Sequence, residues 1–254
     1  MHRMNRLIAS AATAALLTLP VSAMAADDAV ADAIKAAMQH SARTEAEVAR
    51  DRNRKPVETL QFFRLEPDMR VLELVPGGGW YTKLLAQVLE EDGELHVALG
   101  TDRVRDNLVT QDDFDHVVVQ EIDTGFERSG GFLQFTGDLD LDLDDVDLAL
   151  TFRNLHNFTP DARRAMNEMV FEALKSGGYY GVVDHTRRHM QGNDSENRRR
   201  MDPVLAIKEI QEVGFELVDF SDLHYRPDDE LRYEVGRKTV TGNTDRFTLL
   251  FRKP

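Results

Sequence analysis

Two histidines that close apolar segments could carry out acid–base chemistry. His156 follows the apolar run 146–152, and His185 ends the apolar run that begins at Tyr179. Imidazole titrates near neutral pH, so either side chain could take a proton from an attacking hydroxyl or amine. The alternative for His156 is that it caps or fills a loop. Three polar residues stand beside the histidines and could bind a substrate: Asn154, Asn157 and Asp184.

No metal-ligand spacing connects His156, His185 and Asp184, so we expect no metal there. The alternating acids of 138–145 could supply oxygen ligands for calcium, but they lack an ordered loop signature and favour a solvated edge. Five arginines occupy the polar loop 186–202. This loop is either a lid that attracts an anionic substrate or a flexible surface segment. The arginines are Arg187, Arg188, Arg198, Arg199 and Arg200.

A glycine turn joins a buried strand at 71–75 to a helix at about 80–91. Gly77 and Gly79 lie in this turn, and Glu73 precedes it near the strand end. Glycines allow a ligand to approach the backbone, and a helix N-terminus favours negative charge, which indicates a nucleotide-like ligand. A tight turn that only needs positive φ is the alternative. The glycine spacing does not fit the Gly-x-Gly-x-x-Gly pattern of nicotinamide dehydrogenases.

The elements that must position these residues alternate along the chain. Apolar runs predict strands at 71–75, 95–99, 116–122, 146–152, 179–183, 216–223 and 246–251. Helical periodicity predicts helices at 28–50, 56–64, 80–91, 161–174 and 203–213. Alternation indicates a doubly wound, mostly parallel sheet, and the last two strands, with no helix between them, indicate an antiparallel strand at its edge.

Composition narrows the possible partners. The 254 residues carry a formal net charge of −14, which disfavours nucleic acid and anionic lipid surfaces. The chain has no cysteine, so disulfides and cysteine-based metal sites are excluded. We expect a small-molecule substrate.

The first 25 residues have the pattern of a secretory signal. Arg3 and Arg6 precede an apolar stretch that Pro20 ends, and Ala23-Met24-Ala25 is a small-x-small cleavage pattern. The apolar stretch is shorter than the ~20 residues that span a bilayer, so we expect no stable membrane insertion after its removal. The alternative is a short anchor that is never cut. Residues 26–55 then form an N-terminal helical extension, and 56–254 a single domain.

Three further segments, taken with the glycine turn, resemble the class I S-adenosylmethionine-dependent methyltransferases. They are the helix, proline turn and strand of 59–73, the run Asn154-Leu155-His156-Asn157-Phe158, and Phe171 to Gly178. The resemblance covers residues 56–254 and implies a Rossmann-like, seven-stranded α/β fold. The segments Pro-Gly-Gly-Gly-Trp-Tyr-Thr, Phe-Arg-Asn-Leu-His-Asn and Phe-Arg-Lys-Pro are also similar to those of a group of predicted exported bacterial methyltransferases.

The resemblance assigns residue roles. Glu73, Gly77 and Gly79 match the motif that holds the amino-acid end of S-adenosylmethionine, and Asp123 stands where an acid approaches the adenine. Two positions depart from the family pattern. Val75 replaces the first motif glycine, and Leu99 replaces the ribose-binding acid, three residues before Asp102. The remaining assigned residues are Asp102 and Arg153 for the cofactor, Asn154, Asn157 and Asp184 for the acceptor, and His156 and His185 for catalysis.

The resemblance therefore implies methyl transfer to a small-molecule acceptor in the cell envelope. A non-catalytic ligand-binding protein on a retired methyltransferase fold is the alternative, because fold does not fix function. The two departures at Val75 and Leu99, and the cytoplasmic origin of S-adenosylmethionine, favour this alternative.

The signal pattern predicts a periplasmic protein whose mature chain begins at Ala26 or Asp27. N-terminal sequencing of the protein recovered from the periplasmic fraction tests this prediction. Recovery of a chain that still begins with Met1 from the cytoplasm would contradict it.

Overall fold

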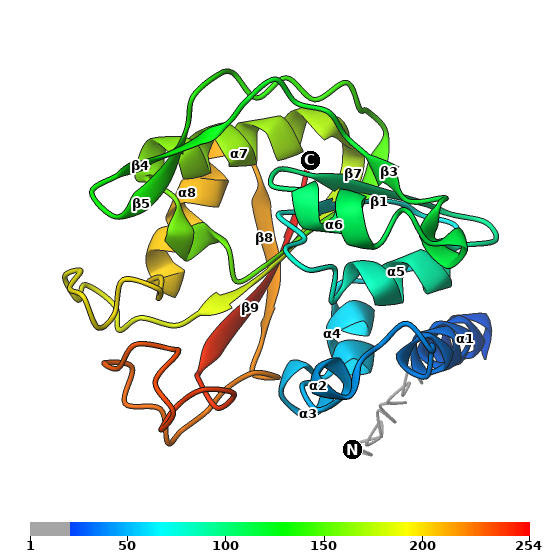
Figure 1. The fold of residues 1–254 in the computed structure, drawn as a ribbon, viewed down its shortest axis with the longest axis horizontal. Helices are drawn as coiled ribbons and strands as arrows, with labels where there is room; N and C mark the ends of the chain where they lie inside the picture. Colours follow the sequence, from blue (N-terminus) through cyan, green and yellow to red (C-terminus); the bar gives the residue numbers. More distant parts are fainter. Residues whose placement is uncertain (1–20) are drawn as a thin grey trace, which may run out of the picture.

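The computed structural model describes residues 21–254, which fold around a seven-stranded mixed sheet (Figure 1). The predicted signal segment lies outside the described residues up to position 20. Along the sheet from β3 through β2, β1 and β6 to β7, each pair of neighbouring strands is parallel, whereas β9 runs antiparallel to both of its neighbours. In sheet order the strands are β3 (Val118–Val119), β2 (Glu94–Ala98), β1 (Arg70–Leu74), β6 (Val146–Phe152), β7 (Leu174–His185), β9 (Arg246–Arg252) and β8 (Glu216–Ser221).

This sheet confirms the predicted doubly wound α/β fold. The antiparallel strand β9 lies one place in from the edge, and β8 forms the edge itself. The central strands form from nearly continuous apolar runs because both of their faces are covered. In β6, for example, six of the seven residues are buried.

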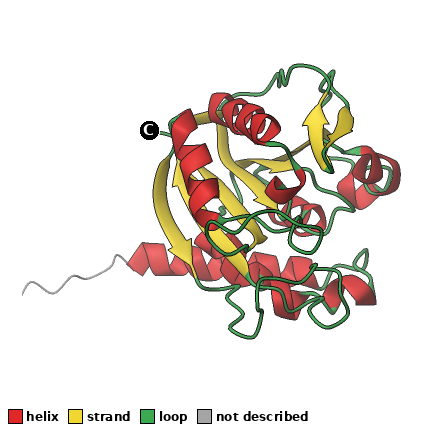
Figure 2. Ribbon diagram, turned by 90° about the vertical axis from the view of Figure 1, so that its left-hand side faces the viewer, coloured by secondary structure: helices red, strands yellow, loops and turns green. Residues whose placement is uncertain are grey.

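Helices cover both faces of the sheet, which gives three layers (Figure 2). Buried side chains of α1 (Val21–Met38), α4 (Pro56–Phe62), α5 (Thr82–Leu89) and α6 (Asp102–Asn107) share one core cluster with the sheet. Those of α7 (Pro160–Ala173) and α8 (Pro203–Val213) share the other. Thr159 and Asp202 cap α7 and α8, and a proline follows each cap at the first helical position.

The N-terminal segment packs into the first core cluster rather than standing apart. The predicted helix over 28–50 is two helices, because α1 ends at Met38 and Thr44 starts α2 (Glu45–Val48) with a capping box to Glu47. Helix α1 buries Val30 and Ile34 among residues of α4 and α5. Within residues 21–254, no helix is long and apolar enough to cross a membrane.

Three features differ from the sequence predictions. The third strand is only two residues long, and α6 follows β2 where no helix was predicted. A separate hairpin, β4 (Phe126–Ser129) with β5 (Phe132–Phe135), lies beyond the strand ends and stacks Phe135 on Phe158.

The acidic run 138–145 is a loop whose leucines pack inward while its aspartates face solvent, as a solvated edge requires.

Candidate functional site

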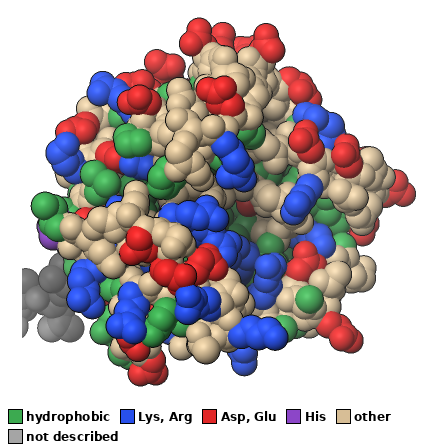
Figure 3. All heavy atoms as spheres, turned by 60° about the vertical axis from the view of Figure 1, so that its left-hand side comes forward, with side chains coloured by type: hydrophobic (Ala, Val, Ile, Leu, Met, Phe, Trp, Pro, Cys, Tyr) green, Lys and Arg blue, Asp and Glu red, His purple; other side chains and the backbone are tan. Residues whose placement is uncertain are grey.

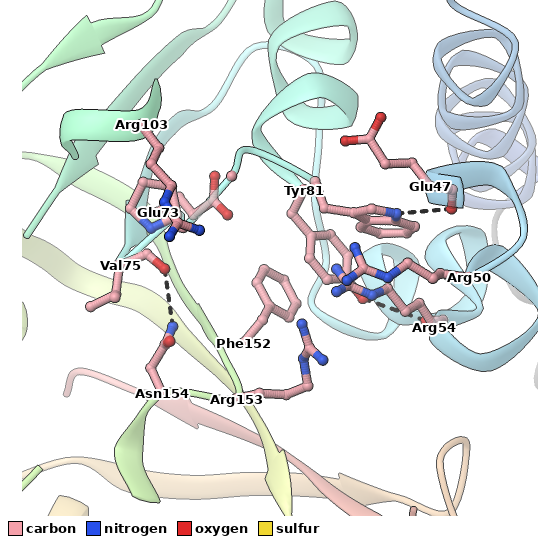
Figure 4. A pocket seen from close by; sticks show the side chains of 14 residues that line it. Glu47, Arg50, Arg54, Glu73, Val75, Tyr81, Arg103, Phe152, Arg153 and Asn154 are labelled. Atoms are coloured by element: carbon pink, nitrogen blue, oxygen red, sulfur yellow. Dashed lines mark hydrogen bonds between the residues drawn. The ribbon is translucent and has the colours of Figure 1, made fainter. Parts of the chain in front are cut away.

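A cavity opens where strands β1 and β6 separate from each other. These strands are neighbours, but α5 and α7 follow them on opposite faces, so their carboxyl ends form a switch point. We call the space between them the switch-point cavity, which has a volume of about 340 Å³. Its lining includes the residues labelled in Figure 4, namely Glu47, Arg50, Arg54, Glu73, Val75, Tyr81, Arg103, Phe152, Arg153 and Asn154, together with Pro76, Gly77, Gly78 and Trp80.

The backbone is strained at the carboxyl ends of three strands. Val75 follows β1 with φ +52°, Leu99 follows β2 with φ +65°, and Arg153 follows β6 with φ +65°. Residues other than glycine rarely adopt this left-handed backbone conformation, and β-branched residues such as valine adopt it least of all. Backbone strain of this kind clusters at functional sites. The two positions that depart from the family motif, Val75 and Leu99, therefore keep a glycine-like backbone without glycine.

Asn154 holds the end of β1 in this conformation. Its side-chain Nδ2 donates to the Val75 carbonyl oxygen at 3.2 Å (Figure 4). It also donates to the Leu74 carbonyl oxygen at 3.3 Å and lies 3.3 Å from Thr151 Oγ1. Asn154 was predicted to bind the acceptor. It lines the cavity, and its amide also joins β6 to β1 across the switch point.

The two motif glycines have different surroundings. Gly77 has φ +62°, lines the switch-point cavity, and would have open space around an added Cβ. Gly79 has φ +77°, but an added Cβ there would lie 3.0 Å from Leu108 of the α6 cap. Gly77 thus leaves room for a ligand, whereas Gly79 allows the close packing of the turn against α6.

Glu73 places a buried carboxyl group in the wall of the cavity. Thr82 Oγ1 donates to Glu73 Oε2 at 2.6 Å. Burial raises the pKa of Glu73 to about 7, and the Thr82 hydrogen bond and the charge of Arg54 act in the opposite direction. This carboxyl group therefore changes its charge near neutral pH and responds to any cation placed beside it.

The opposite wall comes from the N-terminal segment, which the sequence reasoning did not assign to the site. Helix α3 (Asp51–Arg54) holds the Arg54 guanidinium 4.2 Å from the ring centroid of Trp80. The Arg54 carbonyl oxygen accepts hydrogen bonds from the hydroxyl groups of Thr59 and Tyr81. His224 Nε2 also lies within hydrogen-bond distance of this oxygen. Burial lowers the pKa of Arg54 to about 9, and the charge of Arg153 adds to the shift.

A second cavity of about 360 Å³ lies at the carboxyl ends of β2 and β3. Asp102 lines it, together with Leu99, Gln120, Ile122 and Phe126 of the hairpin. Gly100 of this second cavity lies beside Val75 of the switch-point cavity, so the two cavities are neighbours, although they share no lining residue. Asp123 is exposed and lines neither cavity.

The two predicted catalytic histidines line different cavities. His185 lines a third cavity of about 290 Å³, which shares Arg50, Arg54 and Arg153 with the switch-point cavity. Burial holds the pKa of His185 well below its usual value, with neighbouring arginine charges adding to the shift, so the ring is neutral at pH 7. Thr244 Oγ1 lies 3.0 Å from His185 Nδ1.

His156 lines a smaller cavity of about 150 Å³, although its ring centroid is only 5.7 Å from that of His185. Its Nδ1–H donates to Asp184 Oδ1 at 2.5 Å. Asp184 is fully buried and also accepts from the backbone amides of His156 at 2.9 Å and His185 at 2.7 Å. Asp184 therefore orients the His156 ring and fixes the backbone at His185. Asn157 is half-buried and lines none of these four cavities.

The arginine-rich loop does not form a uniform lid. Arg200 is buried in a bidentate ion pair with Asp229, at 2.8 and 3.0 Å, and so stabilises the fold. Arg199 reaches the third cavity and pairs with Glu234. Among the described residues, no group of three His, Cys, Asp or Glu side chains could hold a metal ion.

Comparisons with known proteins support the fold. No protein-family model matches the sequence, and no curated protein matches it. Solved structures are similar at low identity. A SAM-dependent methyltransferase from Aquifex aeolicus has a TM-score of 0.53 and 14% identity, covering 87% of this chain and 97% of that chain. Human N-acetylserotonin methyltransferase in complex with SAM has a TM-score of 0.53 and 14% identity, and the match covers 94% of this chain and 60% of that chain. The [4+2]-cyclase SpnF has a TM-score of 0.51 and 15% identity, and the match covers 80% of this chain and 81% of that chain.

The raised pKa of Glu73 predicts a pH-dependent stability difference between the wild type and Glu73→Gln. The folded state keeps the Glu73 proton up to about pH 7, whereas the unfolded chain loses it near its ordinary value of 4.5. The wild type should therefore lose stability relative to Glu73→Gln as pH rises from about 4.5 to about 7, by roughly 3 kcal/mol at most. Urea unfolding of both proteins across this range measures the difference. A difference that does not change with pH would contradict the assignment.

Proposed function

We propose that this chain transfers a methyl group from S-adenosylmethionine to a small-molecule acceptor. The observation that carries the proposal is the switch-point cavity, in which the Glu73 carboxyl and the Arg54 guanidinium line one space. The amino-acid end of S-adenosylmethionine carries an ammonium and a carboxylate, and these two side chains complement both charges. An ammonium beside Glu73 would also favour its ionised form.

The second cavity suits the nucleoside half of the same molecule. It adjoins the switch-point cavity at Val75 and Gly100, and it combines polar groups with the apolar surfaces of Ile122 and Phe126. We assign Asp102, which is exposed at the start of α6, to the ribose hydroxyls. Open space at Gly77 leaves room for the ligand to approach the turn between the two halves.

S-adenosylmethionine supplies an activated methyl group when it is bound, so the protein has to align the acceptor, exclude water and accept a proton. His185 is the candidate base. It is neutral at pH 7 and lines the cavity that shares Arg153 with the switch-point cavity. His156 was predicted to be catalytic and Asp184 to bind the acceptor. We now assign both a positioning role, because Asp184 holds the His156 ring and the backbone amide of His185.

The cell envelope is the proposed location. Helix α1 packs Val30, Ile34 and Ala37 into the core, and cleavage after Ala25 would leave these three residues in the mature chain. The signal pattern in residues 1–25 supports export, and the acidic composition suits a small-molecule partner better than a polyanion.

A second candidate is a protein that binds a ligand on this fold without transferring a methyl group. The strained Val75 and Leu99, where the family pattern has a glycine and an acid, favour it. The similarity to the cyclase SpnF supports the same caution about inferring a reaction from a fold.

A matched pair of glycine substitutions tests the cofactor site. Gly77 and Gly130 both have positive φ and open space around an added Cβ, but only Gly77 lines the switch-point cavity. We expect Gly77→Val to weaken S-adenosylmethionine binding at least tenfold, because the side chain blocks the ligand, whereas Gly130→Val should bind like the wild type. Isothermal titration calorimetry measures both. No binding by the wild type at millimolar ligand would exclude methyl transfer and favour the second candidate.

The assignment of His185 separates catalysis from cofactor binding. We expect His185→Ala to leave S-adenosylmethionine affinity unchanged and to slow transfer by roughly 10²- to 10⁴-fold, the usual effect of losing a general base. Calorimetry and single-turnover transfer to an acceptor found by screening measure the two effects. Loss of cofactor affinity in this variant would show that His185 belongs to the donor site.

A further inference from the structure

The third cavity has an unusual concentration of positive charge. Five arginines line it: Arg50, Arg54, Arg153, Arg199 and Arg246. We call it the arginine cavity. The chain as a whole carries a net charge of −14, so this concentration is not part of a generally basic surface. Figure 3 shows Lys and Arg side chains gathered around a hollow in one face of the molecule, and Figure 4 shows Arg153 pointing toward Arg50 and Arg54.

These arginines come from segments that are far apart in the sequence. Arg50 and Arg54 belong to the α3 region, Arg153 follows β6, and Arg246 begins β9. Arg246 Nη1 donates to the Asn53 carbonyl oxygen at 2.9 Å, which joins the C-terminal strand to α3. Tertiary folding therefore brings like charges together here, at an electrostatic cost that surface arginines avoid.

Protein carboxylates leave most of this charge uncompensated. Within residues 21–254, Arg199 is the one member of the five with an ion pair, to Glu234. Asp184 is near the cluster, but its carboxylate oxygens already accept hydrogen bonds from His156 and His185. Burial lowers the pKa of Arg246 to about 10 and that of Arg153 as well, and other arginines of the cluster add to both shifts.

One donor in the wall lacks a partner altogether. Arg246 is only 7% exposed, and its Nε is buried without a hydrogen-bond acceptor. Buried guanidinium groups usually have every N–H satisfied, and their planar geometry fits a carboxylate or phosphate with two parallel hydrogen bonds. Beside it, the buried Thr244 adds a hydroxyl and His185 a neutral ring, neither of which repels an anion.

The charge of the donor decides which partner has to supply the anion. S-adenosylmethionine carries a sulfonium, an ammonium and one carboxylate, so its net charge at neutral pH is positive. Its carboxylate can neutralise only one guanidinium, while its sulfonium adds a positive charge to the same region. The donor therefore does not neutralise the cluster, and the second substrate must supply the missing negative charge.

We propose that the arginine cavity binds the methyl acceptor and that the acceptor is a small organic anion bearing carboxylate or phosphate groups. The acceptor role rests on the methyl-transfer function proposed above. The volume of about 290 Å³ suits a small molecule, and the shared wall of Arg50, Arg54 and Arg153 places that molecule next to the donor. His185 in the same wall is then positioned to take its proton.

The first test measures anion binding without the donor, with inorganic pyrophosphate as the probe and sodium chloride at equal ionic strength as the reference. We expect the wild type to bind pyrophosphate in calorimetry, and Arg246→Gln to lose at least tenfold in affinity. Arg198→Gln removes the same charge from an exposed loop position outside the cavity and should bind like the wild type. Equal losses in both variants, or binding no stronger than the salt reference, would overturn the proposal.

Thermal unfolding distinguishes a binding role from a structural one. Arg246→Gln relieves repulsion within the cluster, so we expect its ligand-free midpoint to equal or exceed that of the wild type while the pyrophosphate-induced shift disappears. A large fall in the ligand-free midpoint together with unchanged pyrophosphate affinity would show that Arg246 only supports the fold.

The second test relates the anion to the donor. We expect S-adenosylmethionine to tighten pyrophosphate binding, because its sulfonium adds positive charge, and S-adenosylhomocysteine, which lacks that charge, to do so less. Arg246→Gln should keep its donor affinity. If the donor does not bind while pyrophosphate does, methyl transfer and the acceptor role both fail, but the anion cavity stands. If both bind without coupling, the anion is not the acceptor.

Discussion

Strands β1 and β6 lie side by side in the sheet, but the chain leaves them toward opposite faces, into α5 and α7. Their carboxyl ends must therefore separate, and the gap between them has to be held open by something other than regular sheet hydrogen bonds. Asn154 does this with one amide group that donates to the carbonyl oxygens of Leu74 and Val75. The residues that follow these two strands, Val75 and Arg153, both have positive φ angles.

The N-terminal segment completes the site that this divergence opens. Helix α1 packs on α5, and the short helices after it bring Arg50 and Arg54 over the switch point. Arg246 at the start of β9 and His224 in the loop after β8 close the structure from the other side, because both contact backbone carbonyls of α3. Residues 50–54 and Arg246, which are far apart in the sequence, thus meet at the cavity wall, where buried arginines gather at an electrostatic cost that a bound anion would offset.

Local pattern was sufficient to predict most of the fold. The nearly continuous apolar run 146–152 is typical of a buried strand, and Pro203 to Gly214 carries its own start and stop signals. The exceptions are segments without such signals. Strand β3 has only two paired residues, and the hairpin of Phe126 and Phe135 depends on packing against Phe158.

The site was predicted only where its residues follow strands. Glu73, Gly77, Arg153 and Asn154 come directly after or within β1 and β6, so topology alone brought them together. Arg54 and Arg246 reach the switch-point cavity and the arginine cavity through contacts between distant segments, which no local spacing reveals. Arg50, Arg52 and Arg54 lie in a polar run directly before Pro56. The sequence alone does not indicate that Arg50 and Arg54 line a cavity.

A crystal structure of the protein with S-adenosylhomocysteine tests whether the two neighbouring cavities hold the cofactor. We expect electron density for the amino-acid end between Glu73 and Arg54, for the nucleoside beside Asp102 and Phe126, and for the sulfur facing the arginine cavity. Density for the ligand elsewhere, or its absence from both cavities at saturating concentration, would rule out this cofactor site.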